Sequence, residues 1–196
     1  MKKLVLIAGL IASLATPAFA TTNLVANGTF NITTGWRGVN DGVEHLKSGV
    51  YGLSCQNATC TNLEVLANHS PDSVYQDVSG LVIGHAYELS YLFGGRAGDN
   101  ASMVTSFGGR NIAGSAISGH LGSWVDESFR VIATATTERL EFTAIALSNC
   151  ASCGAEVTNV SLAAVPEVST WAMMLAGFGA LGFVSYRRNK AATLAA

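Results

Sequence analysis

Apolar and polar residues alternate through much of the chain between residues 21 and 165, with the period of a half-buried β-strand. Residues 86–93 and 139–144 show this alternation most clearly. Their core-facing side chains would be Tyr87, Leu89, Tyr91, Phe93, Leu140 and Phe142. Weaker alternation predicts further strands in residues 49–53, 74–78, 102–107, 124–133 and 156–163.

Turn-forming residues separate these segments, with glycine pairs such as Gly94-Gly95 and Gly108-Gly109 among them. No stretch between residues 21 and 165 sustains the 3.6-residue period of an amphipathic helix. Eight or so short strands at this spacing predict an all-β domain, either an antiparallel β-sandwich or a barrel. The segment is long enough to bury a core of its own.

Short motifs mark the course of this domain. It opens with Asn-Leu-Val-Ala-Asn-Gly-Thr-Phe at residues 23–30, and Gly35-Trp36 follows soon after. Residues 73–81 lead into the strongest predicted strand, and residues 157–162 close the domain. This order resembles the jelly-roll modules of the galactose-binding-like and carbohydrate-binding superfamily. The resemblance implies two antiparallel sheets packed face to face, with the first and last strands adjacent.

That family often holds a structural calcium ion between its two chain ends, with a glutamate and an aspartate among the ligands. The matching positions in this sequence are Asn31 and Thr158. Calcium prefers several oxygen ligands that include negative charge. The resemblance therefore leaves a calcium site open at positions that lack its carboxylates, and the residues themselves predict no metal site or cofactor.

A long uncharged stretch lies near the end of the chain, from residue 168 to residue 186. As a helix it would measure roughly 28 Å, close to the hydrocarbon thickness of a bilayer. Trp171 and Tyr186 stand at its ends, where such rings prefer the interface, and Arg187 and Arg188 begin a basic tail at residues 187–190. The pattern predicts a transmembrane helix whose basic end stays in the cytoplasm.

Pro166 and Glu167 precede this stretch, which then runs through alanine, methionine and glycine from Trp171 to Ala180. This order resembles the PEP-CTERM sorting signal of Gram-negative bacteria that make exopolysaccharide, although Val168 replaces the second proline of the motif. The resemblance implies that exosortase, a membrane-embedded transpeptidase-like enzyme, recognises residues 166–196 for surface delivery. A single-pass anchor without processing is the alternative.

The first twenty residues have the features of a secretory signal peptide. Lys2 and Lys3 precede an apolar run, and a small-x-small cleavage pattern ends at Ala20. An uncleaved anchor is the alternative. The two ends together predict an ectodomain of residues 21–165. We expect this ectodomain to lie in the periplasm while the protein is a membrane-anchored intermediate. Its expected final location is the cell surface or the extracellular matrix.

The ectodomain is acidic. Six basic against twelve acidic residues between positions 21 and 165 leave a net charge of −6, which the basic ends of the chain partly mask. An acidic domain without a basic stripe is not expected to bind nucleic acid or to dock on anionic lipid.

The four cysteines form two local pairs, Cys55 with Cys60 and Cys150 with Cys153. Disulfides are the default in the periplasm, and of the three pairings that are possible, proximity favours these two. A zinc site that uses all four thiolates would need the pairs to meet in space. A redox-active Cys150-x-x-Cys153 would normally open a helix beside a parallel sheet. Both remain alternatives.

Residue spacings that indicate catalysis are weak. The sequence has no Gly-x-Ser-x-Gly motif, and its four histidines are scattered singly. Asp126 and Glu127 are neighbours on a predicted strand, so their side chains would point to opposite faces and could not flank one glycosidic bond. The sequence therefore predicts a protein that is not an enzyme.

Aromatic residues near predicted strand ends are candidates for stacking against sugar rings, which is a common feature of sugar-binding sites. These candidates are Trp36, Tyr51, Tyr75 and Trp124. For Trp36 and Trp124 the alternative is burial in the sandwich core, where tryptophan contributes a large apolar area.

These features together predict an exported structural or adhesive protein of the envelope or extracellular matrix, linked to exopolysaccharide. Its expected partners are the sorting enzyme, the membrane and exopolysaccharide. A carbohydrate-binding, lectin-like module is the alternative. A polysaccharide-processing enzyme is a third reading, which lacks a convincing carboxylate pair or nucleophile.

Overall fold

The computed structural model describes residues 22–39, 44–65, 72–96, 100–115, 117–119, 122–145, 154–165, 172 and 175–183. The expected signal peptide, the sorting motif and the flanks of the expected membrane helix lie outside these residues. The predictions that concern them stay predictions. The same holds for the following residues: Cys150, Cys153, Pro166, Glu167, Trp171, Tyr186, Arg187 and Arg188.

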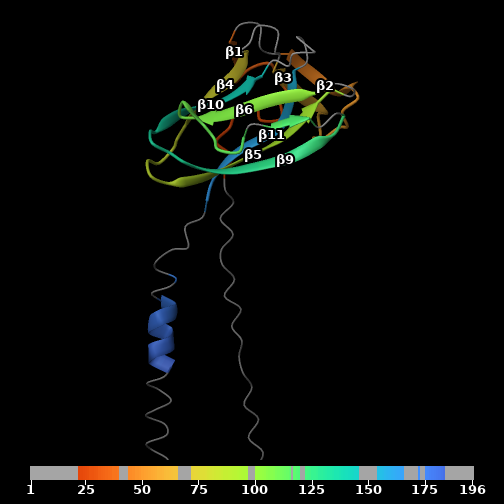
Figure 1. Cartoon of the computed structure of the whole chain (residues 1–196). Coiled ribbons are helices and arrows are strands. Elements are labelled where there is room, and N and C mark those ends of the chain that lie inside the picture. Colours follow the sequence, from red (N-terminus) through yellow and green to blue (C-terminus); the bar gives the residue numbers. More distant parts are fainter. Residues whose placement is uncertain are drawn as a thin grey trace, which may run out of the picture.

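Two antiparallel sheets lie face to face in the described residues (Figure 1). Sheet A contains, in spatial order, β1 (Arg37–Val39), β4 (Ser73–Ser79), β10 (Thr137–Ala144), β6 (Ala101–Phe107) and β7 (Arg110–Asn111), and β8 (Ile117–Gly119) also pairs with β6. Sheet B contains β2 (Glu44–Tyr51), β3 (Thr61–Val65), β11 (Ala155–Ala164), β5 (Ala86–Gly95) and β9 (Trp124–Ile132). The prediction of an all-β sandwich is confirmed.

The core between the sheets is formed by the alternating apolar positions of the two strands with the clearest pattern. Tyr87, Leu89, Tyr91 and Phe93 of β5 are all buried, and Leu140 and Phe142 of β10 face them from sheet A. Full burial of one such large side chain contributes about 1.5–3 kcal/mol. The period-two pattern therefore predicted the inward faces of both strands correctly.

Aromatic rings link the two sheets at the centre of the core. The ring centroid of Phe142 lies 5.0 Å from that of Tyr91 and 5.7 Å from that of Trp36. The Tyr91 hydroxyl crosses to sheet A and shares a 2.7 Å hydrogen bond with the hydroxyl of Thr105. The polar end of Tyr91 is therefore paired although the ring is buried, as buried tyrosines require.

The beginning of the ectodomain packs beside its last strand, as the jelly-roll resemblance implied. The Leu24 amide donates to the carbonyl oxygen of Leu162 at 2.8 Å, and the Val160 amide donates to the carbonyl oxygen of Gly28 at 2.9 Å. The segment does so as a series of turns and not as the expected first strand. Side-chain bonds of Asn23 to Val160 and Leu162 replace part of the missing strand ladder.

The C-terminal part of the described chain is helical at residues 172 and 175–183 (blue in Figure 1). Its large apolar side chains, Leu175, Phe178, Leu181 and Phe183, are exposed. Within the described residues, no helix combines the length and the hydropathy that a membrane span requires. The transmembrane helix expected at about residues 168–186 is therefore not supported by the described residues, and both of its ends lie outside them.

We expect Gly28→Ala to destabilise the ectodomain by about 2–3 kcal/mol or more, because a Cβ atom at this position would collide with the backbone carbonyl of Val160. Thermal unfolding followed by circular dichroism measures the loss. Gly177→Ala, where a Cβ atom meets nothing within 4 Å, is the matched control and should leave the midpoint unchanged. An unchanged midpoint in Gly28→Ala would show that the opening segment is not packed on β11.

Candidate functional site

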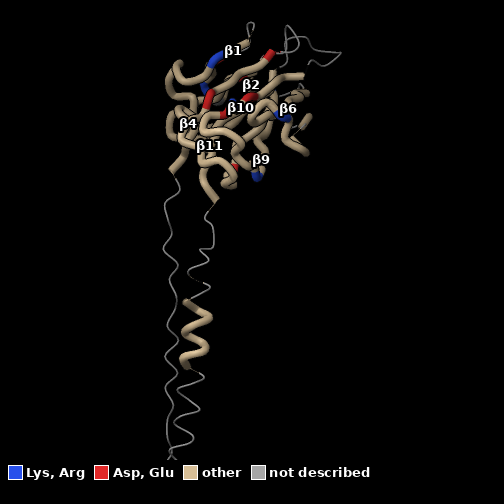
Figure 2. The backbone as a smooth tube through the Cα atoms, turned by 90° about the vertical axis from the view of Figure 1, so that its left-hand side faces the viewer, with Lys and Arg blue, Asp and Glu red and all other residues tan. Residues whose placement is uncertain are grey.

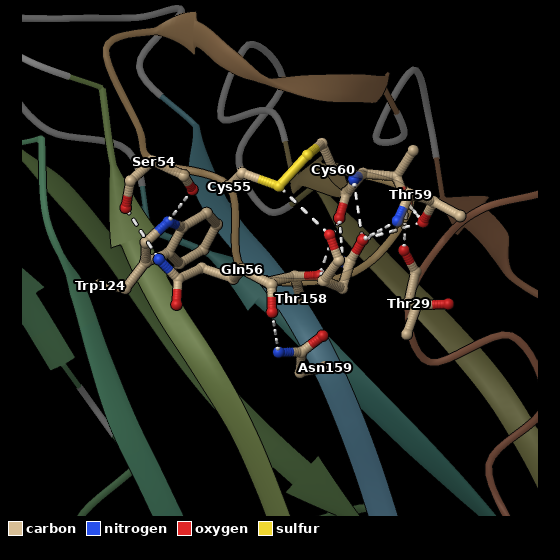
Figure 3. Close-up of a disulfide and its surroundings, with 11 residues drawn as sticks. Thr29, Ser54, Cys55, Gln56, Thr59, Cys60, Trp124, Thr158 and Asn159 are labelled. Carbon is tan, nitrogen blue, oxygen red and sulfur yellow. Dashed lines mark hydrogen bonds between the residues drawn. A yellow bond between two sulfur atoms is a disulfide. The ribbon is translucent and has the colours of Figure 1, made fainter.

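A loop of residues 52–60, within which a disulfide joins Cys55 to Cys60, lies on the outer face of sheet B (Figure 3). The Cys55–Cys60 disulfide confirms the first of the two predicted pairs. Asn57 organises the interior of the loop, because its side-chain oxygen accepts bonds from the amides of Thr59 and Thr61. The loop is therefore held both covalently and by hydrogen bonds, and we call it the disulfide loop.

Hydrogen bonds hold the disulfide loop against sheet B, along the way from β3 to β9. The Asn57 amide donates to the Thr158 hydroxyl at 2.9 Å, and the Asn159 amide donates to the carbonyl oxygen of Gln56 at 3.0 Å. At the far end, the indole N–H of Trp124 donates to the carbonyl oxygen of Ser54 at 2.8 Å (Figure 3). The loop is thus anchored on β11 and reaches the edge strand of the sheet.

A bulge in β11 makes two successive residues available to this loop. Asn159 has a φ of 54°, and the register with β5 shifts between Thr158 and Ser161. Asparagine tolerates this left-handed conformation better than most residues. Because of the bulge, Val157 and Val160 on either side are both buried in the core. The intervening Thr158 and Asn159 can then both bond to the loop.

A cleft of about 760 Å³ lies between the disulfide loop and the outer surface of β5 and β9. We call it the β5–β9 cleft. It is lined by Trp124, by the amide residues Gln56 and Asn159, and by the acidic residues Asp126 and Glu127, of which Asp126 is exposed on the outward face of β9. Hydroxyl groups border it as well, from Ser54, Ser90, Ser123 and Ser128.

Trp124 packs into this cleft because the residue opposite it on β5, Gly94, has no side chain. Trp124 pairs with Gly94 across the two strands, and a Cβ atom at Gly94 would lie only 3.0 Å from the Cε3 atom of the indole. The same Cβ atom would lie 3.3 Å from the Cδ2 atom of Leu53. A glycine at this position therefore lets both the indole and the disulfide loop approach the sheet.

The structure brings only one of the four expected sugar-binding residues into the cleft. Trp36 is a core residue, with 7% of its surface exposed and its indole N–H donated to the carbonyl oxygen of Asn27. The rings of Tyr51 and Tyr75 are each covered by a guanidinium group, of Arg96 and Arg139 respectively, at 3.8 Å from the ring centroid. Trp124 alone among the four lines the β5–β9 cleft.

The position where the family resemblance left a calcium site open is bonded by neutral groups. The Thr158 hydroxyl donates to the carbonyl oxygen of Thr61 and accepts the Asn57 amide, and the Thr61 hydroxyl donates to the carbonyl oxygen of Thr29. An amide donor directed at Thr158 does not suit a cation, which requires oxygen ligands with negative charge. These residues therefore do not fit calcium, and no group of acidic, histidine or cysteine residues that could hold a metal ion occurs among the described residues.

Two carboxylates are buried side by side elsewhere on the outer face of sheet B. Glu64 and Glu156 pair directly across β3 and β11, and both are fully buried. Arg96 donates two hydrogen bonds of 2.8 Å to Glu64, and the Asn62 amide donates to Glu156. Arg96 thus pairs with Glu64, and the buried Oε1 atom of Glu156 has no hydrogen-bond partner among the described residues.

This arrangement favours the protonated form of Glu156. Burial, and next the charge of Glu64, raise the pKa of Glu156 to about 8. Burial also raises the pKa of Glu64, against the opposing effect of Arg96. At neutral pH the Glu156 carboxyl is therefore mostly uncharged, which removes the repulsion between the two side chains.

No protein-family model matches the chain. Two multifunctional-autoprocessing repeats-in-toxin proteins, of Vibrio vulnificus and Vibrio cholerae, are each 32% identical to it over 126 residues, or 61% of this chain. The chain spans only 2% and 3% of the lengths of these two proteins. The match therefore relates the chain to a small part of each toxin.

Several solved structures share the fold. The CBM22-1 xylan-binding domain of Xyn10C from Paenibacillus barcinonensis superimposes with a TM-score of 0.55 at 14% identity, covering 77% of this chain and 99% of that domain. TmCBM61 in complex with β-1,4-galactotriose gives 0.51 at 15% identity, covering 74% and 100%. The enzymatically active domain of tailspike protein 4 from bacteriophage CBA120 gives 0.53 at 14% identity, covering 73% and 21%. These likenesses show that the chain shares the β-sandwich fold of these three structures.

We expect the ectodomain to become less stable as the pH rises from about 5 to 9. In the unfolded chain Glu156 ionises near its ordinary pKa of 4.5, whereas in the folded state its pKa is about 8. The stabilisation is therefore complete below about pH 4.5 and is lost as the pH rises through 8. Since one pKa unit corresponds to about 1.4 kcal/mol, the loss should amount to a few kcal/mol.

The Glu156→Gln variant isolates this effect in denaturant titrations at a series of pH values. It should flatten the pH dependence between 5 and 8 and be more stable than the natural chain at pH 9. Glu88→Gln, which changes an exposed carboxylate on the same sheet, should keep the natural pH dependence. Parallel curves for Glu156→Gln and the natural chain would mean that Glu156 is ionised in the fold.

Proposed function

We propose that residues 22–165 form a carbohydrate-binding module and that a glycan occupies the β5–β9 cleft. The observation that carries the proposal is the composition of the cleft, which combines one tryptophan with hydroxyl, amide and carboxylate side chains. Sugar sites use such a combination, because the aromatic ring packs against the apolar face of the sugar and the polar groups bind its hydroxyls. The shared fold supports the proposal, since one relative is named a xylan-binding domain and another holds β-1,4-galactotriose.

This proposal ranks carbohydrate binding above the structural or adhesive role that the sequence first favoured. A purely structural matrix protein needs no cleft with a supported aromatic ring. Here the disulfide loop, the β11 bulge and Gly94 all position groups around one recess. Attachment to exopolysaccharide would then be a consequence of glycan binding.

The proposed module binds its glycan without cleaving it. Asp126 and Glu127 are the acidic residues of the cleft lining, and they are successive residues of β9. Successive side chains of a strand point to opposite faces, so the two cannot be placed on either side of one glycosidic bond.

Export and sorting form a separate part of the proposal, which rests on the sequence alone. The opening twenty residues resemble a signal peptide, and residues 166–196 resemble a PEP-CTERM signal for exosortase. The glycan-binding domain would thus be delivered to the cell surface or extracellular matrix, where polysaccharide is available.

The mature ends of the protein test the sorting proposal. Mass spectrometry of the protein from cells with exosortase should find a chain that begins at Thr21 and lacks its C-terminal helix. Cells without exosortase should retain residues 166–196. An intact C-terminus in both kinds of cell would favour the plain anchor instead.

Replacement of the cleft tryptophan tests the binding proposal. Trp124→Ala should weaken binding of β-1,4-linked xylo- or galacto-oligosaccharides, or of the exopolysaccharide of the host, by roughly tenfold or more, as expected for a central aromatic anchor. Trp124→Phe should retain part of the affinity, because a ring remains. Isothermal titration calorimetry on the purified full-length chain measures both.

Tyr75→Ala is the matched control, because that ring lies on sheet A under Arg139 and away from the cleft. It should bind as the natural chain does, and circular dichroism should show all three variants folded. Loss of affinity in Tyr75→Ala with none in Trp124→Ala would move the site to the other sheet. Absence of binding to every glycan tested would end the proposal.

A further inference from the structure

The β5–β9 cleft has an unbalanced charge. Its lining includes Asp126, whose side chain is exposed on the outward face of β9, and among the described residues it includes no lysine or arginine. The amide and hydroxyl residues of the lining are neutral. A ligand in the cleft is therefore exposed to negative charge that no neighbouring base of the lining offsets.

Asp126 is the carboxylate best placed to act on a ligand. It is exposed on β9 between Trp124 and Ser128, which share its outward face. Residues two apart on a strand are about 6.6–6.8 Å apart. A sugar ring packed on Trp124 would therefore have its substituents close to the Asp126 carboxylate.

The basic residue of β9 does not neutralise this position. Arg130 lies four residues beyond Asp126 on the same face and pairs across the strands with Glu88. Glu88 in turn accepts a 2.9 Å hydrogen bond from Ser128, the residue between Asp126 and Arg130. The carboxylate of Glu88 is thus nearer to Arg130 than that of Asp126 is, and it offsets the charge of Arg130.

The domain as a whole reinforces this local field. Its net charge is −6, and charged positions are scattered over the described strands without a basic band (Figure 2). A cleft lined by one sign of charge concentrates ligands of the opposite sign and repels those of its own sign.

We propose that the β5–β9 cleft selects glycans that carry protonated amines, such as glucosamine polymers, and rejects glycans rich in uronate or sulfate. An ammonium group is a threefold hydrogen-bond donor, and its bond to a carboxylate is stronger than that of a neutral hydroxyl. The inference rests on the proposed function of the cleft and adds the chemical class of its ligand.

Four oligosaccharide probes of equal length test this selection by titration calorimetry on the full-length chain. They are a glucosamine oligomer, its N-acetylated counterpart, a neutral gluco-oligosaccharide and an oligogalacturonate. The glucosamine oligomer should bind about fivefold more tightly than the neutral probe, which is the scale of one partly exposed ion pair. Its advantage should shrink at high salt, and the oligogalacturonate should bind most weakly.

Two substitutions of equal charge locate the effect. Asp126→Asn should reduce the advantage of the glucosamine oligomer to less than about twofold while binding of the neutral probe persists. Asp77→Asn removes the same charge from sheet A, where Asp77 faces Arg139, and should leave the advantage intact. A similar reduction in both variants would assign the preference to overall charge and overturn the inference.

The remaining outcomes separate this inference from the proposed function. Equal, Trp124-dependent affinity for amine and neutral probes would overturn amine selection but keep the carbohydrate-binding proposal. Tighter binding of the oligogalacturonate than of the glucosamine oligomer would also overturn amine selection and keep the carbohydrate-binding proposal. Failure of all four probes, together with the xylo- and galacto-oligosaccharides, would count against the proposed function itself.

Discussion

The bulge in β11 is the constraint on which the rest of the outer surface of sheet B depends. A regular strand would turn Thr158 and Asn159 to opposite faces, and one of them would then point into the core. The left-handed conformation of Asn159 instead leaves Val157 and Val160 inward and gives both polar residues to the disulfide loop. The same strand receives the opening segment of the domain through Leu162 and Val160. β11 therefore contributes both to the packing of the sandwich and to the wall of the candidate site.

The outer face of sheet B has two halves with different chemistry. Over β3 and β11, the side chains of Glu64 and Glu156 are fully buried. Burial of two carboxylates costs desolvation free energy unless each is protonated or paired with a cation. Arg96 pairs one carboxylate, and protonation of the other avoids a second buried charge. Over β5 and β9, the carboxylate of Asp126 stays exposed and can meet a ligand. Carboxyl side chains are thus part of the packed structure on one half, and on the other half one of them borders the candidate site.

Alternation in the sequence was sufficient to predict an all-β domain and its central strands, whereas the choice of a sandwich over a barrel came from the family resemblance. The faces of β5 and β10 followed from period two, because each of these strands buries one side in the core. Strand β3 was missed although its residues alternate, with polar Asn62 and Glu64 on one face and apolar Leu63 and Val65 on the other. The strand is only five residues long, and the burial of its polar face depends on contacts that the local pattern does not show. The opening segment was expected as a strand, but its bonds to β11 are made partly by the Asn23 side chain. Such replacements depend on tertiary contacts that a local pattern does not encode.

The candidate site was only partly predictable from the sequence. Trp124 was among the expected sugar-binding residues, but Trp36, equally plausible from its position near a predicted strand, is part of the core. Nothing local in the sequence indicates that Arg96 covers Tyr51 or that Arg139 covers Tyr75, since each arginine comes from a distant segment. The roles of Gln56 and Asn159 likewise depend on a contact across 103 residues of sequence. The one feature of the sequence that indicated further cleft residues was the alternation in β5 and β9, because period two assigns Ser90, Leu92 and Asp126 to the outward face.

Nuclear magnetic resonance mapping of bound oligosaccharide tests the central claim most directly, because it locates the ligand without any substitution. The account predicts that titration of the isotope-labelled full-length chain shifts the indole N–H signal of Trp124 and the backbone signals of residues 54–56, 90–92 and 126–128. Shifts clustered around Tyr75 and Arg139 on sheet A, with those of the β5–β9 cleft unchanged, would contradict it.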